Sequence, residues 1–229
     1  MNERSISAIT YVLTPKEKEA KKQLIAAAAS KLFQKNDFNQ ISMAQIAHES
    51  GVAKGTLFNY FKTKENIFMY LLLSGYQDYL TEVLQRFQKT ENITSWADFS
   101  SFILEQNHLL ISQRTDLLRL NALRGPILET TADREQTLAG REKLYEINRK
   151  LGQAIAERIP LLSVKQASHL FIIQSAIISG LMNMMNLDEF HHDQLPVDFK
   201  VFQIDLEQEA NQLMLFYLQG LEQKLKGAK

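Results

Sequence analysis

The chain has 229 residues, with 26 basic and 26 acidic side chains and a formal net charge of zero at pH 7. It contains no cysteine, which excludes disulfides and thiolate chemistry and is typical of the reducing cytoplasm. Hydrophobic residues make up 45% of the chain, enough for a core. Without alternating strand patterns, and without a basic-then-apolar signal at the N-terminus, the sequence predicts an all-α cytoplasmic protein.

Residues 1–14 are expected to form an N-terminal arm, after which a first helix begins. Thr14 and Glu17 match a capping box around Pro15, because the cap hydroxyl and the acidic side chain can each satisfy a free backbone amide. The helix is expected to end near residues 36–37, where Asn and Asp tolerate the left-handed conformation. Its inward stripe is predicted to contain Leu24, Ile25, Ala28, Ala29, Leu32 and Phe33.

Residues 41–61 predict two short helices joined by a tight turn. Ser42 and Gln45 match a second capping box, and Gly51 can end that helix at positive φ without a Cβ penalty. This spacing is typical of a helix-turn-helix, which places its second helix in the DNA major groove. A helical hairpin without a role in DNA binding is the alternative. Residues expected to pack inward are Ile46, Ala47, Val52, Leu57 and Phe61.

The charge is uneven along the chain. Residues 1–70 hold ten basic and six acidic side chains, and the remaining residues hold sixteen and twenty. A positive N-terminal part suggests a surface for phosphates. The predicted DNA-facing residues lie at the start of the first motif helix, on the outward face of the second, and at the start of the next helix: Ser42, Met43, Ala44, Lys54, Gly55, Thr56, Phe58, Asn59, Tyr60 and Lys64.

The run from residue 26 to residue 67 resembles the DNA-binding domain of TetR-type bacterial transcriptional regulators, and the resemblance extends over about residues 18–78. It implies that residues 54–60 form the recognition helix and that two copies bind a pseudo-palindromic operator, usually as a repressor. The matching residues are Ala28, Phe33, Ile46, Ala47, Gly51, Val52, Lys54, Gly55, Thr56, Leu57, Phe61, Lys64 and Glu65.

The resemblance also implies individual roles. Thr56 matches a Thr that contacts DNA near the recognition-helix start, with Lys54 and Gly55 at neighbouring contact positions. Tyr60 and Lys64 match phosphate-binding positions. Three residues depart from the family pattern. Ala53 cannot cap the recognition helix, Phe58 stands where Tyr is usual and cannot donate to phosphate, and Asp37 replaces a common Gly at the end of the first helix.

We expect residues 15–66 to form the DNA-binding domain and residues 67–229 a larger domain for ligand binding and dimerisation, with about nine helices in all. The fourth helix should begin at Lys64, capped by Thr63, and run to about residue 89. Later helices are predicted at 95–113, 115–124, 135–159, 163–187 and 198–224. A loop at 127–135 should follow the breaker Gly125-Pro126. The helix at 135–159 is expected to turn inward Leu138, Leu144, Tyr145, Leu151 and Ile155.

Residues 163–187 are apolar nearly all round. Polar residues interrupt this stretch, and its apolar runs fall short of the ~18 residues of a membrane span. Burial against a second copy is therefore expected, in a four-helix bundle with residues 198–224 of both chains. The resemblance implies the same pairing, and the core of a monomer is the alternative. The predicted interface residues are Phe171, Gln174, Ile178, Leu181, Leu213, Tyr217 and Leu221.

The resemblance implies a small-molecule effector in the middle of the larger domain, whereas an ordinary core is the alternative reading of the residues concerned. Arg119 and Arg124 could pair with a ligand carboxylate or with Glu. His191 and His192 have no third ligand at clear spacing, so we expect no metal or other cofactor. The predicted pocket residues are Trp96, Phe99, Phe102, Leu120, Arg124, Tyr145, Met182 and Met185.

The leading hypothesis is a homodimeric repressor released from its operator by a small molecule. An architectural or partner-recruiting DNA-binding protein without an effector is the first alternative. A helical enzyme is the second, although the sequence has no catalytic motif.

Overall fold

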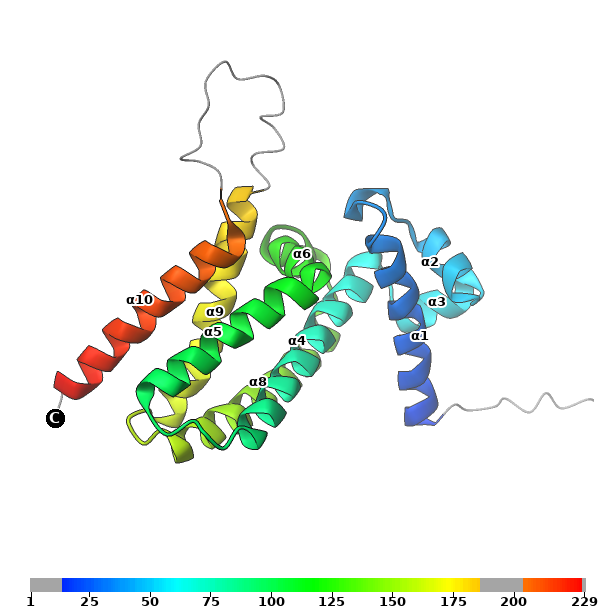
Figure 1. Ribbon diagram of the computed structural model, residues 1–229. Coiled ribbons are helices and arrows are strands. Elements are labelled where there is room, and N and C mark those ends of the chain that lie inside the picture. Colours follow the sequence, from blue (N-terminus) through cyan, green and yellow to red (C-terminus); the bar gives the residue numbers. More distant parts are fainter. Residues whose placement is uncertain (1–13, 186–203, 228–229) are drawn as a thin grey trace, which may run out of the picture.

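The computed structural model of the chain describes residues 14–185 and 204–227, and every regular element within these ranges is helical. This confirms the predicted all-α class. An N-terminal head contains α1 (Pro15–Phe33), the short turn η1 (Phe38–Gln40), α2 (Met43–Ser50) and α3 (Lys54–Tyr60). The body contains α5 (Trp96–Gln113), α6 (Thr115–Leu123), α7 (Glu129–Thr131), α8 (Arg134–Arg158), α9 (Val164–Met185) and α10 (Leu206–Gly227). Between them α4 (Lys64–Lys89) runs from the head into the body (Figure 1).

The helix starts of the head follow from local chemistry, as predicted. The Glu17 amide donates to the Thr14 hydroxyl at 3.3 Å, and the Thr14 amide donates to the Glu17 carboxylate at 2.7 Å. Ser42 and Gln45 make the same reciprocal pair at α2. Gly51 ends α2 with φ at 65°, a conformation that favours glycine. These caps confirm the predicted spacing of the helix-turn-helix.

Two expectations in the head are wrong. The first helix ends at Phe33 without a left-handed residue, because the Asn36 side-chain amide donates to the Leu32 carbonyl at 2.8 Å and η1 follows. Leu24, predicted inward, is 46% exposed, since the buried face of α1 is centred on Ile25, Ala29 and Phe33. The predicted lack of a cap at α3 is confirmed, because Ala53 precedes this helix and makes no side-chain capping hydrogen bond.

The core of the head is closed by α4. Leu57 and Phe61 are fully buried, and the rings of Phe33 and Phe38 lie 5.4 and 5.2 Å from the ring of Phe68 on α4. The head therefore packs onto the first turns of α4, whose remaining length belongs to the body.

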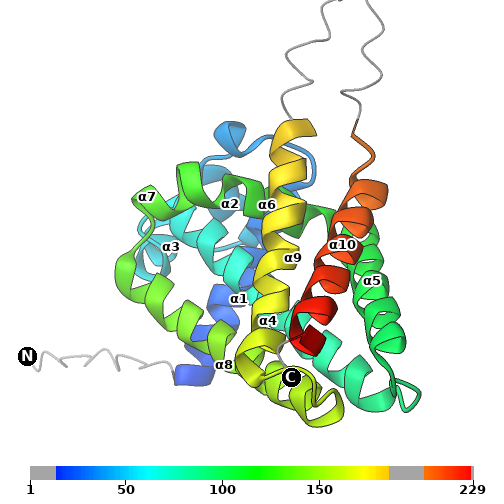
Figure 2. The same cartoon turned by 90° about the vertical axis from the view of Figure 1, so that its left-hand side faces the viewer.

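In the body, α4 packs along α8, α8 along α9, and α10 against both α5 and α9. Figure 2 shows α9 and α10 side by side on one face of the body. Two glycines of α8 allow close approaches to neighbouring helices. A Cβ on Gly140 would lie 2.8 Å from Leu73, and one on Gly152 would lie 2.9 Å from the backbone oxygen of Val164.

Three further expectations in the body are corrected. Gly125-Pro126 does not begin a loop, because a π-helical turn (Arg124–Leu128) absorbs the proline and leads into α7. Leu138 and Tyr145 are 47% and 57% exposed, since the inward row of α8 runs through Leu151 and Ile155. The last helix begins at residue 206 rather than 198, and residues 198–203 lie outside the described ranges.

Candidate nucleic-acid interface

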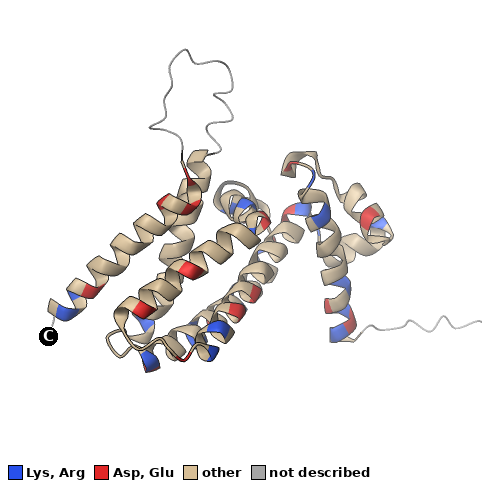
Figure 3. Cartoon of the chain, viewed as in Figure 1, with Lys and Arg blue, Asp and Glu red and all other residues tan. Residues whose placement is uncertain are grey.

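The outward face of α3 carries the residues predicted to meet DNA. Lys54, Gly55, Phe58 and Asn59 are exposed, whereas Leu57 on the opposite side is fully buried. Thr56 and Tyr60 are half-buried, and the helix contains no carboxylate. Figure 3 shows basic and acidic residues together on α1, and the helices of the body also carry both signs of charge.

The start of α2 offers fewer unbonded polar groups to DNA than predicted. The Ser42 hydroxyl is occupied by the cap, because it donates to the Gln45 side-chain oxygen at 2.8 Å and accepts from the Gln45 amide. Met43 is half-buried against the core, and Ala44 is exposed. Contacts of these three residues with DNA remain predictions.

Lys64 occupies a different environment from the one implied by the resemblance. Its ammonium donates to the backbone oxygens of Phe38 and Ile41 at 2.8 and 3.0 Å, and it lies 4.3 Å from the centre of the Phe38 ring. These bonds tie the connection between α1 and α2 to the start of α4. The ammonium is directed at backbone carbonyls of its own chain, which gives Lys64 a structural role, and its contact with phosphate stays a prediction.

The head is fixed to α8 on one side of α4. The Gln136 side-chain amide donates to the Tyr60 backbone oxygen at 3.3 Å, and the Lys62 ammonium lies 3.4 Å from the Asp133 carboxylate. The Asp133 amide donates to the buried Asn66 side chain at 2.8 Å. A hydrogen bond from the backbone amide of Gln136 lowers the pKa of Asp133, and the neighbouring Lys62 ammonium lowers it further.

The head is fixed to α6 on the other side of α4. The Arg119 guanidinium donates to the Phe33 backbone oxygen at 3.2 Å and lies 4.5 Å from the centre of the Phe33 ring. Arg119 also lies 3.7 Å from the Asp116 carboxylate, so its described partners belong to its own chain. No sequence signal identified these head-to-body contacts, because they join residues 67 to 86 positions apart.

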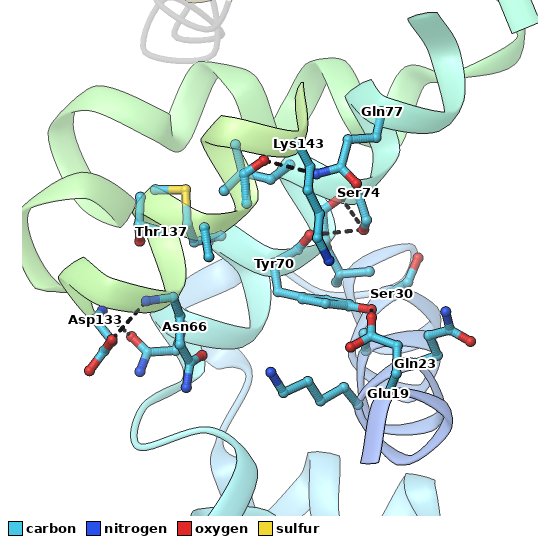
Figure 4. A pocket seen from close by; sticks show the side chains of 18 of the residues that line it. Glu19, Gln23, Ser30, Asn66, Tyr70, Ser74, Gln77, Asp133, Thr137 and Lys143 are labelled. Carbon is cyan, nitrogen blue, oxygen red and sulfur yellow. Dashed lines mark hydrogen bonds between the residues drawn. The ribbon is translucent and has the colours of Figure 1, made fainter. Parts of the chain in front are cut away.

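A groove of about 800 Å³ lies between the head and the body (Figure 4). Its walls are α1 and the first half of α8, and α4 forms its floor. The Tyr70 hydroxyl donates to the Glu19 carboxylate at 2.7 Å, and burial raises the pKa of Tyr70. Gln77 bonds the backbone oxygen of Gly140 at 2.9 Å. Polar and apolar side chains both line this groove, and no residue predicted for the effector pocket is among them.

The eight predicted pocket residues do not enclose one cavity. Phe99 and Phe102 are buried against Phe87, whereas Tyr145 is exposed. Arg124 pairs with Glu129 at 2.7 Å. Trp96 lines a separate hollow near the C-terminal end of α8, Leu120 and Met182 are buried, and Met185 lies at the end of α9. Within the described ranges no three His, Asp or Glu side chains could hold a metal, and His191 and His192 lie outside them.

The interior of the body contains a buried polar network that the sequence analysis did not identify. The Tyr79 hydroxyl donates to the Gln174 side-chain oxygen at 3.0 Å, and the Gln174 amide donates to Asn107 at 2.7 Å. Gln106, fully buried, accepts from Arg86 at 3.1 Å. Burial raises the pKa of Tyr79. Gln174 therefore bonds within its own protomer, contrary to its predicted place in the dimer interface.

The other α9 residues predicted for the interface also face their own protomer, because Phe171, Ile178 and Leu181 are 6%, 1% and 8% exposed. The exposed apolar row of α9 lies on the opposite side. On α10, Tyr217 and Leu221 are half-buried and pack against the core, and Leu213 is exposed. The large apolar side chains of the two helices that are exposed are Val164, Ile172, Met184, Leu213 and Phe216.

In length and composition α9 matches a membrane-spanning helix, with a mean hydropathy of 1.3 in its most apolar window. One third of that window is buried within the protomer, where α9 packs against α6, α8 and α10. The core of the protomer thus accounts for one side of this helix, and its other side is open.

A capped helix-turn-helix mounted on a helical body defines the architecture of a one-component DNA-binding regulator. A family model described as bacterial regulatory proteins, tetR family, matches residues 25–71, and one described as tetracyclin repressor-like, C-terminal domain, matches residues 73–224. The chain therefore belongs to the TetR family.

Individual relatives are more distant. The fatty acid metabolism regulator protein of Bacillus subtilis is 32% identical over 74 residues, which are 32% of this chain and 36% of that protein. The chain spans 35–44% of the length of the curated relatives that it matches.

Two solved structures share the fold. The TetR family repressor AlkX from Dietzia sp. strain DQ12-45-1b is 17% identical, with a TM-score of 0.54 over 88% of this chain and 95% of that one. The regulator FadR from Bacillus subtilis, in complex with stearoyl-CoA, is 19% identical, with a TM-score of 0.50 over 86% and 96%.

Proposed function

We propose that the protein is a homodimeric transcriptional repressor that binds a pseudo-palindromic operator through α3 and is released by a small-molecule effector. The observation that carries this proposal is the face of α3, which presents Lys54 and Asn59 to solvent and contains no carboxylate. Phosphates and base edges both attract such a surface. Its supports are rigid, because Gly51 fixes the turn before α3 and Leu57 anchors the helix in the core.

Dimerisation is supported by the open side of α9 and α10. On α9, Ile172, Ala176, Gly180 and Met184 recur every four residues, and all four are exposed. Leu213 and Phe216 extend the apolar face over α10, which lies beside α9 in Figure 2. Two copies that pair through this face form a four-helix bundle whose small residues allow close approach. The two heads are then held at a fixed separation, which must match half-sites about 34–36 Å apart or a little more.

The DNA-binding part is tested by selecting fragments of genomic DNA that the purified protein retains, followed by gel shifts on the selected sequences. We expect a shared inverted repeat and binding that weakens steeply with salt, because displaced counterions accompany every phosphate contact. Equal retention of all fragments would contradict an operator-specific regulator.

The dimer is tested by sedimentation of two matched variants. Phe216→Glu places a charge in the proposed interface and is expected to yield monomers that no longer bind the operator tightly. Tyr145→Glu is the control, because Tyr145 is equally exposed, at 57%, but lies on α8. A Phe216→Glu variant that stays dimeric would exclude this face as the interface.

The groove between head and body supports a place for the effector. Its walls come from α1 of the head and α8 of the body, so an occupant changes the position of one against the other. Its volume of about 800 Å³ lies within the usual range of ligand pockets, roughly 300–1,000 Å³. One observation favours the effector-independent alternative, since bonded polar side chains occupy the described interior of the body.

Thermal melting and gel shifts with stearoyl-CoA, palmitate and a panel of polar metabolites separate these two possibilities. An effector raises the melting temperature of the free protein and weakens operator binding. If no compound does both, the effector-independent alternative replaces our proposal. Thr137→Trp narrows the groove and is expected to abolish the response while the variant still binds DNA.

A further inference from the structure

The outward face of α3 contains one large apolar side chain, which cannot bond the polar groups of DNA. Phe58 is 41% exposed, and it belongs neither to the hydrophobic core nor to the described side chains that pack against the core. In the described part of the head, Leu24 is the other large apolar side chain with comparable exposure, and it lies on α1. Phe58 is therefore the apolar group that α3 offers to solvent.

The orientation of Phe58 follows from the register of α3. Leu57 and Phe61, four residues apart, are fully buried and fix the inward side of the helix. Phe58 lies about 100° around the helix from Leu57, and Gly55 precedes it by three residues on the same outward side. The ring is thus held on the surface by the anchoring of its neighbours.

Gly55 leaves the helix surface bare beside this ring. A Cβ at Gly55 would meet nothing within 4 Å, and its φ is not positive, so neither packing nor backbone conformation requires glycine there. The absence of a side chain leaves room for another molecule against the flank of the Phe58 ring.

The apolar chemistry of the Phe58 ring limits the groups of DNA that it can contact favourably. Phenylalanine has no donor or acceptor, so contact with a phosphate or with the polar edges of guanine, cytosine or adenine leaves those groups without a partner. The C5-methyl group of thymine is the apolar group that the major groove exposes. An aromatic ring at the surface of a recognition helix is complementary to that methyl group.

We propose that Phe58 contacts the C5-methyl group of one thymine in each operator half-site and makes that position selective for thymine. This inference rests on the proposed operator binding. It assigns a specificity role to a side chain that cannot donate to phosphate as the usual Tyr does.

The test uses a series of operators, in each of which one thymine position is replaced in both half-sites by deoxyuridine. Deoxyuridine lacks only the methyl group. We expect one position at which deoxyuridine weakens binding of the unmodified protein about fourfold per half-site, the effect of one methyl group returned to water. Phe58→Ala must bind the thymine and deoxyuridine operators equally at that position. Phe58→Gln, which keeps a longer side chain on the helix, must show the same loss of discrimination.

Leu24→Ala is the matched control, because it removes an exposed apolar side chain from the head outside α3. It is expected to keep both the affinity and the deoxyuridine effect. Two results overturn the proposal. In the first, no thymine has a methyl effect that depends on residue 58. In the second, both Phe58 variants lose affinity for the thymine and deoxyuridine operators by the same factor, so that they still discriminate between the two. If the unmodified protein shows no sequence preference at all, the proposed function fails instead, which keeps the two outcomes distinct.

Discussion

Lys64→Met is predicted to destabilise the head without changing the salt dependence of DNA binding. Methionine retains an unbranched apolar stem and removes the charge. The variant cannot form the two hydrogen bonds to the backbone oxygens of Phe38 and Ile41, which contribute about 1.5 kcal/mol each for a charged, half-buried donor. The contact with the Phe38 ring adds about 0.5 kcal/mol. The free energy of unfolding should therefore fall by about 3.5 kcal/mol.

Urea denaturation followed by circular dichroism measures this decrease, and operator binding is measured between 50 and 200 mM salt, roughly the range over which phosphate contacts are weakened. Lys54→Met is the matched control, because Lys54 is exposed on the face of α3. It should leave stability within about 0.5 kcal/mol. The slope of log K against log salt should become shallower by about 0.9 for each phosphate that the Lys54 ammonium neutralises.

The opposite pattern would refute the structural assignment of Lys64. If Lys64→Met unfolds at the same urea concentration as the unmodified protein and flattens the salt slope, the ammonium binds phosphate. The residue would then have the role that the resemblance implies, and the bonds to Phe38 and Ile41 would contribute little.

Three shorter predictions concern the body. Tyr79→Phe leaves the buried Gln174 oxygen without a donor and should cost about 1–3 kcal/mol of unfolding free energy, and an unchanged urea midpoint would contradict this. Gly152→Ala should cost about 1–3 kcal/mol, because its Cβ would press on the backbone of α9, and a thermal melt at or above the wild-type value would show that the helices can separate cheaply. The lowered pKa of Asp133 means that its charge stabilises the folded state above its unfolded pKa of about 3.9 and that this stabilisation disappears as the pH falls through and below that value. The stability difference between the wild type and Asp133→Asn should therefore be present at pH 7 and vanish near pH 2–3, and a difference independent of pH would exclude the carboxylate as its source.

The head was predictable because local chemistry determines it. Thr14, Ser42 and Gly51 act on residues within one turn, so their spacing alone locates the helix ends. The faces of α9 were not predictable in the same way. A helix that is apolar nearly all round has no pattern to separate its inward from its outward side, and Gln174 was placed outside although it bonds Tyr79 and Asn107.

The prediction of the effector pocket failed for a related reason. Aromatic residues and methionines mark apolar interiors of every kind, so composition cannot tell Phe99 in a filled core from a side chain at a cavity wall. The groove between α1 and α8 is lined by polar and apolar residues of distant segments, and Asp133 and Asn66 meet only after the chain has folded.

The open side of α9 has a consequence for the synthesis of the protein. Until α9 has docked, a newly made chain exposes a segment that is as long and apolar as a membrane span, and folding of the single chain buries one third of its most apolar window. Under our dimer proposal, the rest is hidden only when a sister chain arrives, so the cellular abundance of the regulator and its escape from chaperones and proteases both depend on how soon partners meet.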